Sequence, residues 1–517
     1  MTIAKATFWG LLTCVSLSAA WPALAAGTLR FGVAAADLGT LDPARATSTP
    51  DKPLTGWIYN GLVRFKPGSD DISALEPDLA ESWGESEDGK VWTFKLRPGV
   101  KFHHGYGELT AEDVVFSLKR ASNPDTSAFA TDYKAVENIE AVDALTVRIT
   151  LRQRVPSLLG LVSNYHGGNI ISKKAAEEEG AGFATKPVGT GPFMVDSYTS
   201  QESVRLVRNP DYFRGVPKLD GIEVRYIPSD SARDLALRAG ELDVSYGRQD
   251  QQWIDATKGM SGFVVDIMRP AELQQFHLNM TSAPLDKIEV RRAVATALNR
   301  DEFVKFIGTS LAQPAGSVIP TGNLGWDNST PIFGQGDAEA AKKMLADAGF
   351  PDGIKLKMIQ TSLPNMLSVA QVAQAQLAKA GIDLQLDVVD HQTFHAQIRK
   401  DLSQVVYYSA ARFPVADVFL SQFFLSDSIV GKPTAATNFS HCDVADDEIL
   451  GARAEPDPEK QRALWAAAQK KIIENVCAVP LYEQLIAYAR RENVDWGYDL
   501  KADLHLGPVI TELTDLK

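Results

Sequence analysis

The stretch that decides the fold is EPDLAESWGESEDGKVWTFKLRPGVKFHHGYGELTAEDVVFSLKRA, residues 76–121. Residues 91–96 alternate aromatic and β-branched with other side chains, which predicts a half-buried strand. The run 87–90 before it (EDGK) carries an Asp-Gly turn signal, so we expect a β-hairpin. Thr110 then opens a helical pattern, where its hydroxyl can cap free backbone N–H groups. The stretch predicts a scaffold, and nothing in it looks catalytic.

Length and charge set the outer limits of the interpretation. A chain of 517 residues is too long for one hydrophobic core, so we expect at least two lobes. The formal net charge is −13 and the pI is near 5.2. Binding to phosphate backbones needs clustered Lys and Arg, and the sequence has no such cluster. Nucleic acid is therefore not an expected partner.

The N-terminus predicts export. Lys5 precedes an apolar run over residues 8–20, and Ala23-Leu24-Ala25 follows, which is typical of a signal peptide over residues 1–25 that is cut near Ala25. A retained membrane anchor is the alternative, although the apolar run is short for a span. Cys14 lies within that run and follows Thr13, which argues against a lipoprotein. We expect a soluble periplasmic protein, because no later segment offers ~20 uninterrupted apolar residues.

Two cysteines remain after the signal peptide, Cys442 and Cys477. An even count in an oxidising compartment favours a disulfide. A pair of buried free thiols is the alternative, because a sequence does not show whether two Cα atoms come within bonding range.

Helical and strand patterns alternate in the second half of the chain. Gly, Pro and Asp residues mark the ends of the expected helices. We expect helices over residues 290–298, 337–348 and 365–380 and from Asp457-Pro458, and strands over residues 356–359 and 382–388. This alternation predicts α/β lobes.

Several short motifs together resemble the signature of the extracellular solute-binding proteins of family 5, the peptide, opine and nickel receptors of ABC importers. The motifs are residues 78–83 (DLAESW), 92–102 (WTFKLRPGVKF), 110–114 (TAEDV), 189–193 (GTGPF), 209–212 (NPDY), 240–243 (GELD), 290–293 (VRRA) and 479–482 (VPLY). They occur in order along essentially the whole mature chain. Each motif alone is weak, whereas the set is specific.

The resemblance implies an α/β fold like that of type II periplasmic binding proteins, with two hinged lobes and an extra α/β domain (the cluster C architecture). The implied division is lobe I over residues 26–56, 188–270 and 487–517, the extra domain over 57–187, and lobe II over 271–486. A small molecule or peptide binds between the lobes, and hinge closure presents the closed form to a membrane permease. We expect a monomer without cofactor or metal.

Arg412 stands where this sequence departs from the family. Many members carry Trp-x-x-Asp-Tyr-x-Asp-Pro before Phe-Leu, and the first Asp pairs with the α-amino group of the ligand. Counting back from Phe419-Leu420 puts Arg412 at that Asp and Ser409 at the Trp. A guanidinium binds carboxylate or phosphate through two parallel hydrogen bonds. We therefore expect a small polar anion, an opine or a sugar-phosphate conjugate.

Two alternatives stay open for this site. Arg412 could serve only to pair with a neighbouring acid such as Asp417. An oligopeptide receptor could anchor the main chain of its ligand through other residues.

Other ligand-binding candidates come from their places in the motifs. Three follow the 240–243 signature on a loop expected to face the cleft. Asn438 precedes a segment that resembles the family's cleft edge, and Asp37 lies just before residues 41–43. His505 is polar in an otherwise apolar run, where a structural histidine is the favoured alternative. The candidates are Tyr246, Arg248, Gln249, Asp37, Asn438, His505 and Tyr408. Tyr408, with its neighbour Tyr407, could stack on a ligand ring or belong to the core.

Enzyme and metal functions find little support. The sequence has no Gly-x-Ser-x-Gly, His-Glu-x-x-His or Gly-x-x-x-x-Gly-Lys motif, so we expect a binding protein rather than a secreted hydrolase. The Gly-rich turn at 189–193 contains Pro192 and does not open a helix, so it is not expected to hold phosphate. His391 and His395 are spaced to share a helix face but lack an obvious third ligand, and His103-His104 is taken as a structural turn.

Overall fold

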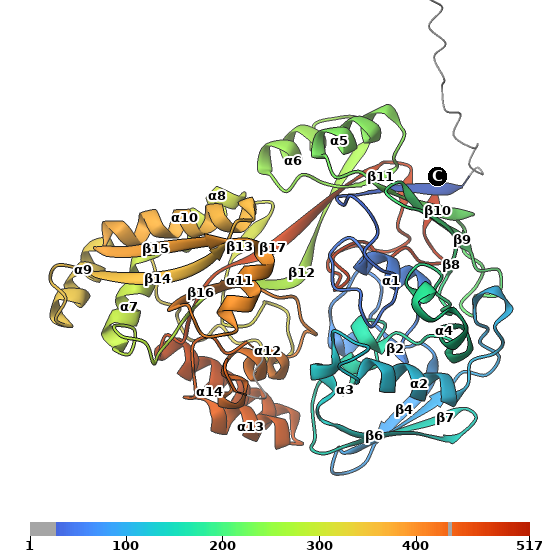
Figure 1. Ribbon diagram of the computed structural model, residues 1–517, viewed down its shortest axis with the longest axis horizontal. Helices are drawn as coiled ribbons and strands as arrows, with labels where there is room; N and C mark the ends of the chain where they lie inside the picture. The colour runs from blue at the N-terminus through green and yellow to red at the C-terminus, as the bar shows by residue number, and fades with distance from the viewer. Residues whose placement is uncertain (1–26, 433–436) are drawn as a thin grey trace, which may run out of the picture.

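A computed structural model describes residues 27–432 and 437–517, and it places two α/β bodies side by side (Figure 1). The first body holds residues 28–262 and 492–517, and the second body holds residues 279–477. The predicted signal peptide lies outside the described residues. Within the described ranges, no helix is both long and apolar enough to cross a membrane.

The stretch at residues 76–121 folds as its sequence predicts. β4 (Ala80–Glu85) and β5 (Val91–Leu96) pair antiparallel, with Trp83 opposite Phe94, so the hairpin is confirmed. α2 (Ala111–Ala121) begins with a capping box between Thr110 and Asp113. Glu112 and Asp113 lie in its first turn, where the helix dipole favours negative charge.

The hairpin belongs to a four-stranded antiparallel sheet in the order β4-β5-β7-β6, completed by β6 (Val136–Asp143) and β7 (Thr146–Leu151). The apolar side chains of α2, Val114 and Leu118, are fully buried in the same hydrophobic cluster as Phe94 and Phe31. The small sheet and the main sheet of the first body therefore share one core.

The main sheet runs through both bodies in the order β15-β14-β16-β12-β17-β11-β1-β10-β9-β8, with β13 beside β17. In that order the strands are β15 (Ile382–Val389), β14 (Ile354–Thr361), β16 (Val405–Tyr408), β12 (Phe263–Leu278), β17 (Ala478–Arg491), β11 (Val244–Tyr246), β1 (Thr28–Val33), β10 (Gly221–Tyr226), β9 (Ser203–Arg208), β8 (Phe193–Thr199), and β13 is Ala312–Pro314.

The strands β12 and β17 form the connection between the bodies (Figure 1). The start of β12 pairs with the end of β17 beside β11, and the end of β12 pairs with the start of β17 beside β16. Between Met268 and Glu272 the register shifts. A register shift interrupts the ladder and bends the strand, so the connection is irregular midway between the two bodies.

The helices of the second body confirm the α/β pattern that the sequence predicts. They include α7 (Ile288–Ala297), α9 (Ala338–Asp347), α10 (Pro364–Lys379) and α14 (Pro458–Glu474). The carboxylate of Asp337 accepts a hydrogen bond from the Ala340 N–H at 2.9 Å, and Asp457 caps α14 in the same way. The structure joins Cys442 to Cys477 by a disulfide with a Cα–Cα distance of 5.7 Å.

Candidate functional site

A cavity of about 430 Å³ lies between the two bodies. Residues 129–167 of the first body form one wall, which includes α3 (Leu158–Leu161), and residues 412–428 of the second body, with Arg453, form the other. The second wall includes α12 (Ala416–Phe423) and α13 (Asp446–Ala454), which face α3 in Figure 1. A cavity of this volume suits a small-molecule ligand.

Arg412 lies in the wall of this cavity, on the loop between β16 and α12. The side chain is half-buried. Its Nε donates to Oε1 of Gln422 at 2.7 Å and its Nη1 donates to the carbonyl of Ala411 at 2.9 Å. Its Nη2 has no hydrogen-bond partner among the described residues, so part of the guanidinium is available to an acceptor in the cavity.

Among the described residues, no acid forms a salt bridge with Arg412. Asp417 instead pairs with Arg453, whose Nε lies 3.2 Å from its Oδ1. Asp417 is therefore not the ion-pair partner of Arg412. Burial raises the pKa of Asp132 on the facing wall, and the nearby charge of Arg412 acts to lower it. Arg412 thus faces an acid across the cavity without a direct ion pair.

An aromatic stack forms the wall that faces Arg412. The ring of His166 lies 4.1 Å from that of Phe129 and 3.6 Å from that of Tyr165, centroid to centroid. The Tyr165 hydroxyl and the Nε2 of His166 are buried and have no hydrogen-bond partner within residues 27–432 and 437–517. This wall therefore consists of three stacked rings with two buried polar atoms.

Two further charged residues lie near Arg412. Lys52 begins α1 (Lys52–Ile58), and burial lowers its pKa to about 8, while Glu272 raises it and Arg412 lowers it. Glu272 lies at the register shift of β12, its backbone bridges to Ala411, and its Oε1 accepts a hydrogen bond from Ser409 at 2.8 Å. Burial, followed by the charge of Glu272, raises the pKa of Tyr246 to about 12.

The comparisons with known proteins agree with this geometry. The family model described as bacterial extracellular solute-binding proteins, family 5 (middle), matches residues 74–431. This chain belongs to family 5 of the bacterial extracellular solute-binding proteins. Members of this family are periplasmic substrate-binding proteins of transporters rather than enzymes. They work with the permease of an ABC importer.

Three relatives illustrate the range of ligands in family 5. The structure of MoaA from A. tumefaciens R10 in complex with mannopinic acid is 50% identical, with a TM-score of 0.84 over 95% of this chain and 99% of that chain. DppA from Helicobacter pylori, in complex with the peptide STSA, is 28% identical, with a TM-score of 0.79 over 95% and 98%. The glutathione-binding protein GsiB of Escherichia coli K12 is 29% identical, over 88% of this chain and 89% of its own.

These matches establish the fold class that the sequence predicts. The chain has the mixed α/β, multi-domain fold of the type II periplasmic binding proteins of family 5. It is a periplasmic solute-binding protein of an ABC importer.

Three of the residues predicted to bind ligand in this family 5 protein make contacts away from the cavity. Gln249 bonds the backbone of Ala487 through both its amide N and O, at 3.1 Å each. Arg248 is exposed and pairs with Asp250 at 3.2 Å. Asp37 accepts hydrogen bonds that lower its pKa to about 2, led by that of Ser200 and followed by that of the Gln201 N–H.

Two more predicted residues are buried within the second body. Tyr408 is only 8% exposed, and its ring packs 5.1 Å from that of Phe439. Asn438 is fully buried and donates to the carbonyl oxygens of Leu425 and Cys442 at 3.0 and 2.8 Å. Neither residue is part of the cavity wall.

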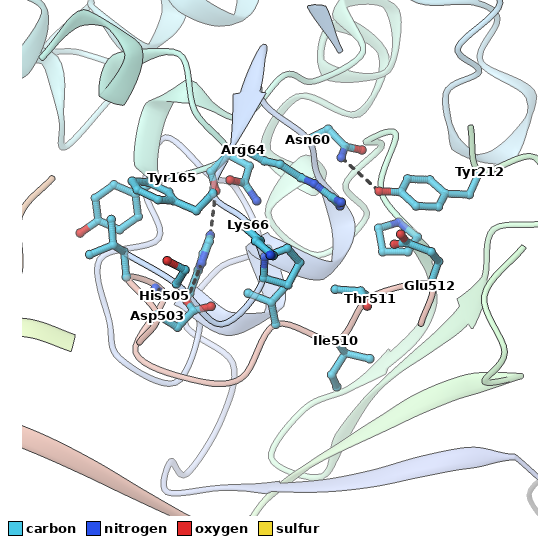
Figure 2. A pocket seen from close by; sticks show the side chains of 18 residues that line it. Asn60, Arg64, Lys66, Tyr165, Tyr212, Asp503, His505, Ile510, Thr511 and Glu512 are labelled. Atoms are coloured by element: carbon cyan, nitrogen blue, oxygen red, sulfur yellow. Dashed lines mark hydrogen bonds and ion pairs between the residues drawn. The ribbon is translucent and has the colours of Figure 1, made fainter. Parts of the chain in front are cut away.

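His505 lines a much smaller pocket, shown in Figure 2, with room of about 30 Å³, which suits a single water molecule. Its Nδ1 lies 2.9 Å from Asp503 and its Nε2 lies 2.7 Å from the carbonyl of Asn164. Burial acts to lower the pKa of His505, but Asp503 and the carbonyl outweigh it, so that the pKa is raised.

His391 and His395 share a face of α11 (His391–Ile398), as their spacing predicts, and their Nε2 atoms lie 3.2 Å apart. Nδ1 of His391 is 3.1 Å from the Thr361 hydroxyl, and Nδ1 of His395 is 3.1 Å from the guanidinium of Arg399. Across the described residues, no group of three or more His, Cys, Asp or Glu could hold a metal ion.

Of the residues predicted from the sequence, Arg412 lines the cavity, whereas Tyr246 does not and lies instead within electrostatic reach of Glu272. The structure places five further residues near Arg412 that were not predicted: Lys52, Asp132, Tyr165, His166 and Glu272. Glu272 had a weak signal, because it is an acid in the apolar and aromatic stretch 269–279. The other four are ordinary loop and helix-end residues that only the packing of distant segments brings to the site.

Proposed function

We propose that this protein captures an opine-type solute, a small polar molecule with a carboxylate, and delivers it to the importer's permease as a monomer. The observation that carries the proposal is Arg412, a guanidinium that lines the cavity with Nη2 unbonded. A charge-assisted bond from Nη2 to a carboxylate is stronger than a bond between neutral groups. The 50% identity to a mannopinic acid receptor supports the same class of ligand.

A sugar-phosphate conjugate would offer Arg412 a phosphate in place of the carboxylate. The geometry of the guanidinium serves both anions. We favour the carboxylate, because the relative of 50% identity was solved in complex with mannopinic acid, which is named as an acid.

We further propose that the chain divides into lobe I (26–56, 188–270 and 487–517), an extra domain (57–187) and lobe II (271–486), and that closure occurs about β12 and β17. The register shift between Met268 and Glu272 supports a hinge there. A ligand stabilises the closed form only by the difference between its affinities for the two forms. Arg412 and Asp132, on opposite walls, supply such a difference, because a solute can contact both only when the walls are together.

A peptide receptor is the second candidate, because relatives of 28% and 29% identity are named for a peptide complex and for glutathione. Arg412 argues against it, since a cation would face the α-amino group of a peptide at the position where many family members have an acid.

A thermal-shift screen of the mature protein with mannopinic acid, glutathione and the peptide STSA tests the proposal. A ligand at 100 times its Kd should stabilise the native state by about 2.7 kcal/mol. We expect mannopinic acid to raise the Tm. A rise with the peptide or glutathione, and none with mannopinic acid, would refute the proposed ligand class.

A further inference from the structure

The wall opposite Arg412 holds two polar groups that the acid-binding role does not use. The hydroxyl of Tyr165, a residue only 5% exposed, and the Nε2 of His166 are buried without a hydrogen-bond partner in the part of the chain that the structure describes. Buried polar atoms in native proteins are nearly always hydrogen-bonded, and one that is not requires an explanation.

Both residues line the large cavity, on the side that faces Arg412. Tyr165 also lines the small pocket of His505, but Figure 2 shows its hydroxyl turned away from that pocket. The ring of Tyr165 lies edge-on to that of His505 at 6.0 Å, which leaves the hydroxyl end free to point the other way. Burial raises the pKa of Tyr165 and the charge of Arg412 acts to lower it, so the hydroxyl lies within electrostatic reach of the Arg412 wall of the large cavity.

His166 is held in place by its surroundings. Its ring is nearly parallel to that of Phe129, with an interplanar angle of 8°, and is stacked on Tyr165 on the other side. Its backbone has φ of 51°, in the left-handed region that few residues other than glycine adopt. Such strained conformations persist where the surrounding structure fixes them, and they occur often at ligand sites.

The chemistry of the two groups favours an uncharged partner. Burial, followed by the charges of Lys52 and Arg412, lowers the pKa of His166 well below its usual value, so the imidazole is neutral. A neutral imidazole and a phenol hydroxyl each offer one donor and an acceptor. A carboxylate needs donors only, whereas a hydroxyl group both donates and accepts.

We propose that Tyr165 and His166 form a subsite for the hydroxyl groups of a polyol chain, so that the solute is a conjugate of a polyol with an acid. The acid binds Arg412 and the polyol chain lies along the aromatic stack. The acid end of this assignment rests on the proposed function, while the polyol end rests on the two unpartnered atoms. Phe129 and the ring faces beside it supply apolar contact for the C–H groups of the chain.

Two substitutions and two probes test the subsite by calorimetry. The probes are mannopinic acid and its analogue with hydrogens in place of the hydroxyl groups on the sugar-derived chain. We expect Tyr165→Phe to weaken the binding of mannopinic acid about tenfold, since a ligand hydroxyl loses its partner. The Kd of the same variant for the analogue should differ less than twofold from that of the wild type. His166→Phe keeps the aromatic stack and should show the same pattern.

Tyr59→Phe is the matched control. The Tyr59 hydroxyl is fully buried and donates to the carbonyl of Leu41 at 2.8 Å, outside the cavity. Its loss should lower the Tm and leave both Kd values unchanged. Tyr165→Phe should leave the Tm unchanged and raise the Kd of mannopinic acid alone, because the hydroxyl that it removes has no partner among the described residues.

Each outcome bears on one of the two proposals. Equal weakening of both probes by Tyr165→Phe, or no weakening of either, overturns the polyol subsite and leaves the acid-binding function intact. Failure of the wild type to bind either probe overturns the proposed function and the subsite together.

Discussion

Gly160 of the first body packs against Phe413 of the second body, and Gly160→Ala should weaken ligand binding. A Cβ at Gly160 would lie 2.4 Å from Cγ of Phe413 and 2.6 Å from its Cδ2. Phe413 follows Arg412 directly, is 6% exposed, and also packs 5.6 Å from the ring of Phe65. The added methyl group therefore opposes the packing that closes the cavity beside Arg412.

The size of the effect follows from the geometry. Real Cβ atoms essentially never approach another heavy atom this closely, and overpacking of a well-packed contact costs about 1–3 kcal/mol. If the ligand binds only while the two walls are together, that cost appears in the binding free energy. At about 1.4 kcal/mol per factor of ten, the apparent Kd should rise roughly 5- to 150-fold.

Calorimetric titration with mannopinic acid measures this change. Gly84→Ala is the control, because a Cβ at Gly84 meets nothing within 4 Å. The double variant Gly160→Ala/Phe413→Leu should recover most of the affinity, since the smaller side chain makes room for the methyl group. A folded Gly160→Ala protein that binds within twofold of the wild type would refute the role of this contact in closure.

Two predictions concern stability. The Cys442–Cys477 disulfide closes a loop of sequence separation 35, so its removal in Cys442→Ala/Cys477→Ala should lower the free energy of unfolding by about 3–4 kcal/mol in urea titrations. A urea midpoint that neither this double variant nor reduction of the wild type changes would contradict the bond. Asp37→Asn should lower the Tm near pH 6. The pKa of Asp37 is about 2 in the folded protein against an ordinary 3.8, so the carboxylate stabilises the folded state fully above pH 3.8 and this stabilisation is lost as the pH falls through 2. A Tm difference that is the same at pH 6 and pH 2 would refute that account.

Local signals in the sequence predicted much of the fold. The 76–121 hairpin and helix, the Asp337 cap and the Pro458 helix start all depend on neighbours within a few residues, and the structure confirms each of them. The strand pairing that joins β12 to β17 depends on residues about 200 positions apart, for which periodicity gives no signal.

The candidate site was only partly predictable. Arg412 was found because it departs from a motif. Asn438 and Gln249 have the polar side chains of a binding site, but the structure gives them backbone partners. Tyr165 and His166 lie in an unremarkable segment, and their importance comes from the stack with Phe129 and from the lack of partners for their polar atoms.

The most direct test of the central claim is the affinity of Arg412 variants for mannopinic acid. Arg412→Gln should raise the Kd about 100-fold, because removal of one member of a buried charged contact typically costs 2–5 kcal/mol. Arg412→Lys keeps the charge without the planar guanidinium, so its Kd should lie between those of the wild type and Arg412→Gln. Arg462→Gln, at an exposed position of α14, is the control. A Kd of Arg412→Gln within twofold of the wild type would contradict the claim that this residue binds the acid of the solute.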